Sequence, residues 1–67
     1  MTNEQLYDNA KKIIDELYDL GSGSWDTYDG KRVKLISWWM GLYSIDNVSL
    51  GYNDAIKYLA FGELTSN

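Results

Sequence analysis

The first twenty residues carry apolar side chains at the spacing of an α-helix. Intervals of four and three residues alternate, which places these side chains on one helical face. Thr2 is a suitable N-cap with Gln5 three positions later, and Gly21 can end the helix. We therefore predict a helix over residues 2–20, with an apolar face formed by Leu6, Ala10, Ile13, Leu17 and Leu20.

The next ten residues combine Gly and Ser with two aromatic side chains, Trp25 and Tyr28. This mixture is typical of a loop that is anchored by its rings. The pair Asp29-Gly30 is also a frequent hairpin turn. A β-hairpin over about residues 25–36 is therefore an alternative to the loop.

Residues 31–45 are rich in bulky apolar side chains, and their structure decides the fold class. On a helical wheel, the apolar residues surround a narrow arc of small and polar ones, as in a nearly buried helix. A strand would place Trp38, Trp39 and Met40 on both faces of a very small sheet, which disfavours that interpretation. We predict a helix here, with an arc formed by Lys34, Ser37, Gly41 and Ser44.

After a connection at residues 46–51, a third helix is predicted over residues 52–61, ending at Gly62. Closure of three apolar helix faces predicts a compact, all-α, three-helix domain that occupies residues 1–67. An α+β fold, with the hairpin at about residues 25–36 between helices, is the alternative. The apolar face of the third helix contains Tyr52, Ala55, Ile56 and Leu59.

Composition narrows the possible chemistry. The chain has 67 residues without Cys or His, so thiol nucleophiles, imidazole bases, disulfides and the common nitrogen and sulfur metal ligands are absent. Three Trp, six Tyr and one Phe supply the bulk that a small core needs. We expect a domain stabilised by packing, with no enzyme activity, cofactor or metal.

The formal net charge of −4 disfavours a general attraction to nucleic acid or anionic lipid and favours a basic protein partner. No segment resembles a secretory signal, and none approaches the roughly 20 apolar residues of a membrane span. We expect a cytoplasmic protein.

Four carboxylates form a row opposite the apolar face of the first helix. Near neighbours in the row are about 6 Å apart along the axis, which is comparable to the spacing of phosphates along a nucleic-acid strand. The row could therefore imitate a nucleic-acid backbone, or it could be a solvated helix face with ion pairs such as Lys11–Asp15. Its members are Glu4, Asp8, Asp15 and Asp19.

Two short segments that follow are further candidates for binding. Rings mixed with acids are typical of protein-interface hot spots, although such rings could also cover the core. The second segment is basic and lies at the start of the helix predicted over residues 31–45, where the helix dipole disfavours positive charge. We therefore expect neighbouring acids to compensate its charge. The first segment contains Trp25, Asp26, Tyr28 and Asp29, and the second contains Lys31, Arg32 and Lys34.

These features favour a small acidic regulator or inhibitor that blocks a basic, nucleic-acid-binding site of a host enzyme. By analogy with small acidic proteins of phages and mobile elements, it would be of the anti-CRISPR or DNA-mimic type. No motif of a particular family is present. Two alternatives stay open: a DNA-binding accessory protein that uses Lys31, Arg32 and Lys34, and an oligomerising structural module.

Overall fold

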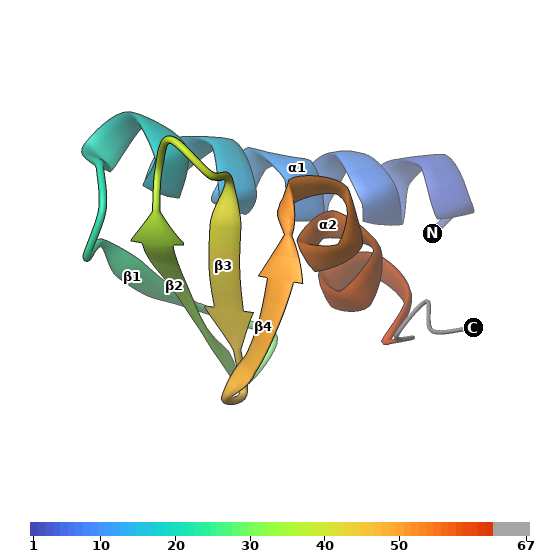
Figure 1. The fold of residues 1–67 in the computed structure, drawn as a ribbon. Helices are drawn as coiled ribbons and strands as arrows, with labels where there is room; N and C mark the ends of the chain where they lie inside the picture. The colour runs from blue at the N-terminus through green and yellow to red at the C-terminus, as the bar shows by residue number, and fades with distance from the viewer. Residues whose placement is uncertain (63–67) are drawn as a thin grey trace.

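The fold is α+β, so the predicted three-helix domain is wrong. A computed structural model describes residues 1–62 and contains, in chain order, a helix, four strands and a helix (Figure 1). Each strand pairs antiparallel with the next, in the order β1-β2-β3-β4. The elements are α1 (Asn3–Leu20), β1 (Trp25–Tyr28), β2 (Lys31–Ser37), β3 (Leu42–Ile45), β4 (Val48–Gly51) and α2 (Tyr52–Phe61).

The first helix is confirmed with the caps that its sequence predicts. The Gln5 backbone N–H donates to the Thr2 hydroxyl at 3.1 Å, and the Thr2 N–H donates to the Gln5 side chain at 3.0 Å. This capping box satisfies two backbone donors at the helix start. Gly21 ends the helix with a φ of 100°, which favours glycine, and its N–H donates to the Leu17 carbonyl.

Two short turns build the outer hairpins of the sheet. Asp29 and Gly30 have φ values of 50° and 78° and join β1 to β2. Asp46 and Asn47 have φ values of 51° and 69° and join β3 to β4. Type I′ turns need positive φ at both central residues, and Asn, Asp and Gly tolerate this best. The hairpin proposed as an alternative over about residues 25–36 is therefore present.

The central helix predicted over residues 31–45 is wrong, because this segment forms β2, a turn and β3. Along β2, Val33 and Leu35 are buried while Arg32 and Lys34 are exposed. This alternation has the period of a strand with one buried face. The predicted connection at residues 46–51 likewise contains the second hairpin turn and β4.

The bulky residues Trp38, Trp39 and Met40 form the turn between β2 and β3. Their exposed fractions are 52%, 73% and 59%, so none of them belongs to the core. Because these three residues lie in a turn and not in a strand, they do not have to occupy both faces of the sheet.

A single core lies between one face of the sheet and both helices. α1 runs across the strand direction, and α2 packs beside it (Figure 1). The Tyr43 hydroxyl, fully buried on β3, donates to the Ile14 carbonyl of α1 at 3.1 Å and so connects the two layers. The predicted third helix is confirmed as α2. The core contains Ala10, Ile14, Leu17, Val33, Leu35, Tyr43, Ile45, Ala55, Ile56 and Leu59.

Within residues 1–62, neither helix has the length and apolar character required to cross a membrane.

Leu17 and Trp39 test this division between core and turn. Leu17→Ala should lower the free energy of unfolding by about 2–5 kcal/mol, because the side chain is 1% exposed and its removal leaves a cavity. Trp39→Ala should change it by less than about 0.5 kcal/mol, as is usual for surface residues. Urea unfolding measures both. Equal destabilisation by the two substitutions would contradict the exposed turn.

Alkaline unfolding tests the burial of Tyr43. Burial, reinforced by the nearby charges of Tyr52 and Asp15, raises the pKa of Tyr43 from 10.0 to about 12. The folded state therefore retains the proton more tightly, so the stability contributed by this group is complete below pH 10 and lost as the pH rises towards 12. The melting temperature should fall across this window, and Tyr43→Phe should flatten the fall. An unchanged slope in Tyr43→Phe would contradict the assignment.

Candidate functional site

The face of the sheet that points away from the helices collects residues from all four strands. Directly opposed residues share a face, and the register places Trp25 opposite Lys34, and Lys34 opposite Ser44. We call this surface the open sheet face. It contains Trp25, Thr27, Arg32, Lys34, Ile36, Ser44 and Ser49.

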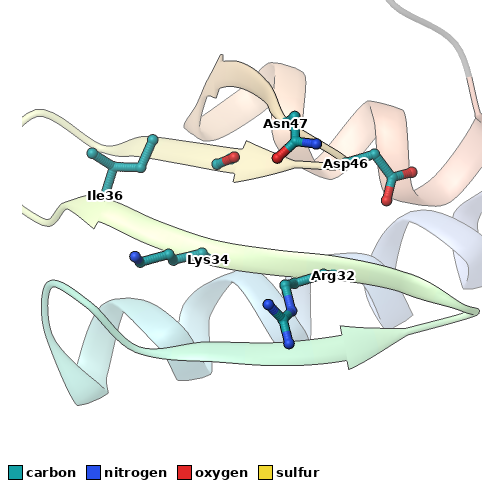
Figure 2. Close-up of a pocket in the computed structure, with 6 residues that line it drawn as sticks. Arg32, Lys34, Ile36, Asp46 and Asn47 are labelled. Atoms are coloured by element: carbon teal, nitrogen blue, oxygen red, sulfur yellow. The ribbon is translucent and has the colours of Figure 1, made fainter.

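A shallow groove of about 550 Å³ lies on the open sheet face. Figure 2 shows Arg32, Lys34 and Ile36 succeeding one another along β2, while Asp46 and Asn47 stand at the end of β3. Ser44 also lines it. Its lining residues thus supply two cations and one carboxylate, a positive balance in a chain whose formal net charge is −4.

Trp25 and Arg32 form a cation–π pair at the edge of this surface. The Arg32 guanidinium carbon lies 4.5 Å from the centroid of the Trp25 ring. Such a pair contributes about 0.5–1 kcal/mol at an exposed site. Trp25 remains 55% exposed, so the interpretation of this ring as a cover for the core is wrong. Tyr28, by contrast, packs partly buried against the core.

The turn at residues 38–40, which we call the aromatic turn, extends from the open sheet face at Ile36. The Trp38 backbone N–H donates to the Ser22 hydroxyl at 3.0 Å. The Trp38 ring meets the Tyr18 ring of α1 edge to face, with centroids 6.2 Å apart. These contacts fix the base of the turn, while Trp39 and Met40 remain largely exposed.

The basic cluster predicted from sequence is divided by strand alternation. Lys31 pairs with Tyr28 and lies on the opposite side of β2 from Arg32. Its ammonium nitrogen is 4.0 Å from an Asp29 carboxylate oxygen, so the expected compensation by a neighbouring acid is present for Lys31. No helix begins at this point, and the helix-dipole argument does not apply. Arg32 and Lys34 remain together on the open sheet face.

The carboxylates of residues 25–29 make local contacts. An Asp26 carboxylate oxygen accepts the Thr27 backbone N–H at 2.7 Å. Asp26 pairs with Val33 in the sheet and so points away from the open sheet face. Asp29 occupies the first hairpin turn. Of the four binding residues predicted in this segment, only Trp25 lies on the open sheet face.

The acidic row of α1 lies on another side of the molecule, and one of its members is engaged in the fold. Glu4, Asp8 and Asp19 are exposed. Asp15 accepts hydrogen bonds from the Lys11 ammonium at 2.9 Å and from the Tyr52 hydroxyl of α2 at 2.6 Å. Partial burial raises the pKa of Asp15, but the hydrogen bonds from Tyr52 and Lys11 outweigh it, so the net shift is downward.

Sequence reasoning missed Ile36, Ser44, Asn47 and the exposure of the aromatic turn. The alternation of residues 31–35 and the Asp46-Asn47 pair are the signals that could have found the sheet face. Across residues 1–62, no group of three or more acidic side chains is arranged to hold a metal ion.

Comparisons of this chain with protein-family models, with curated proteins and with solved structures found no match.

Asp15→Asn tests the contact between the helices. The variant should lose about 1 kcal/mol at neutral pH, since the carboxylate is partly exposed and solvent weakens its contacts. A lowered pKa means that this stability is present above pH 3.8 and is lost as the pH falls further. The gap between the melting temperatures of parent and variant should therefore close in acid. Asp8→Asn, on the exposed face, is the control, and an equal effect there would contradict a specific role for Asp15.

Proposed function

We propose that this protein acts by binding another protein through the open sheet face and the aromatic turn together. The observation that carries the proposal is the exposure of residue types that dominate interface cores. Tryptophan, methionine and arginine are enriched there, and tryptophan and arginine are frequent hot spots. The exposed residues of these types are Trp25, Arg32, Trp38, Trp39 and Met40, and the exposed Ile36 lies on the same surface.

The distribution of bulky residues supports a dedicated surface. The core of this small domain is filled mainly by Ile, Leu, Val and Ala, with one tyrosine. All three tryptophans are more than half exposed. Contiguous exposed apolar patches on protein surfaces mark interaction sites. Contacts at Tyr18 and Ser22 hold the turn in place, so less conformational freedom is lost when a partner binds.

The acidic row of α1 gives a second candidate, the imitation of a nucleic-acid backbone. It is supported by the exposure of Glu4, Asp8 and Asp19 on the outer side of the helix. It is weakened by Asp15, whose carboxylate is engaged by Lys11 and Tyr52. The two candidate surfaces lie on separate elements, so substitutions can test them independently.

Affinity capture from lysate of the source cells tests the proposal. The immobilised parent should retain a specific protein, and a turn variant with Trp39→Ser and Met40→Ser should retain at least tenfold less. The helix variant Asp8→Asn with Asp19→Asn should retain the same protein as the parent. Both pairs are exposed, so melting temperatures should stay near that of the parent.

The opposite pattern would contradict the proposal. Retention by the turn variant together with loss by the helix variant would assign the interface to the acidic row. Measurement of the captured protein by quantitative mass spectrometry distinguishes the two results.

A further inference from the structure

The chemical character of the groove changes along β2, and this change restricts what can bind there. Asp46 and Asn47 follow the end of β3, where the Asp46 backbone N–H donates to the Arg32 carbonyl, and the cations Arg32 and Lys34 lie on β2. Ile36 follows at the other end and leads to the aromatic turn. An occupant that runs along β2 therefore meets Arg32 with Asp46 across from it, then Lys34, then an apolar surface.

The spacing of the two cations matches an extended chain. Arg32 and Lys34 are two residues apart on one strand, which places their Cα atoms about 6.4–6.8 Å apart along it. In an extended peptide, side chains at alternate positions have the same repeat. The guanidinium of Arg32 is held beside the Trp25 ring. The planar N–H groups of a guanidinium can donate two parallel hydrogen bonds to one carboxylate.

We propose that the groove binds an extended acidic segment of the partner protein. This inference rests on the proposed function. The segment carries carboxylates at two alternate positions, which face Arg32 and Lys34. A large apolar residue follows towards Ile36 and the aromatic turn. A neutral or basic residue lies at the Asp46 end.

A protein segment fits this groove better than a single-stranded nucleic acid. A nucleic-acid backbone carries a phosphate at every nucleotide and would place charge beside Asp46 as well as beside the cations. The net charge of −4 repels such a polyanion more strongly at longer range than it repels a segment with two carboxylates. A peptide can place its carboxylates only where the cations lie.

Fluorescence anisotropy with labelled probes tests the inference. The first probe is a short peptide with Glu at two alternate positions followed by Phe, with Lys before them. The second replaces both Glu by Gln, and the third is a short oligothymidylate. The parent should bind the Glu peptide at least tenfold more tightly than the Gln peptide. About 1 M salt, at which the Debye length is roughly 3 Å, should reduce this preference strongly.

Matched charge variants locate the binding site. The groove variant Arg32→Gln with Lys34→Gln should lose the preference for the Glu peptide. The control variant Lys12→Gln with Lys57→Gln removes the same charge from exposed helical positions and should keep the preference. Amide chemical shifts should move in β2 and β3 when the Glu peptide is added. Circular dichroism should show that both variants keep the fold.

Three outcomes would overturn the inference. The first is equal affinity for the Glu and Gln peptides. The second is tighter binding of oligothymidylate that is lost in the groove variant, which would make the groove a nucleic-acid site. The third is salt-sensitive self-association in sedimentation that the groove variant abolishes, which would make a second copy of this chain the occupant.

Affinity capture with the turn variant and the groove variant distinguishes failure of this inference from failure of the proposed function. If the turn variant loses the partner while the groove variant retains it, protein binding stands and the acidic segment is wrong. If neither variant changes retention, both proposals are wrong.

Discussion

The packing of Val33 and Leu35 against the helices is the interaction on which the rest of the structure depends. Strand alternation puts both side chains on one face of β2, and the register adds Tyr43 and Ile45 from β3 to that face. Both helices cover this face because it holds the apolar surface of the sheet. Within residues 1–62 both helices lie on this face, and Arg32 and Lys34 on the other face are exposed.

Two tyrosine hydroxyls connect α1 to the elements that pack against it. The hydroxyl of Tyr43 donates to a helix carbonyl, and that of Tyr52 donates to Asp15. The second contact draws one carboxylate of α1 into the junction between the helices. The other three carboxylates of the acidic row remain exposed on α1, whereas the residues that line the groove on the sheet include two cations and one carboxylate. One small domain therefore presents surfaces of opposite charge on different layers.

Parts of the candidate surface were visible in the sequence, but their association was not. Trp25 and the pair Arg32 and Lys34 were each candidates, assigned to separate elements. The antiparallel register of β1 and β2 brings them together, and a cation–π contact results. The exposure of the aromatic turn was hidden in the sequence because Trp38 and Trp39 are large apolar residues of the kind that often fill a core. Exposure depends on where the chain reverses, and that is a property of the whole sheet.

The sequence by itself determined the elements whose signals are local. The capping box at Thr2 and the periodic apolar face specify α1, whereas Asp29-Gly30 left a hairpin turn as an alternative to a loop. The tertiary structure alone decided the state of residues 31–45. Their apolar run is compatible with a helix, whose hydrogen bonds are local, and with strands, whose hydrogen bonds need distant partners. Pairing with β1 and β4, and burial beneath both helices, selects the strands.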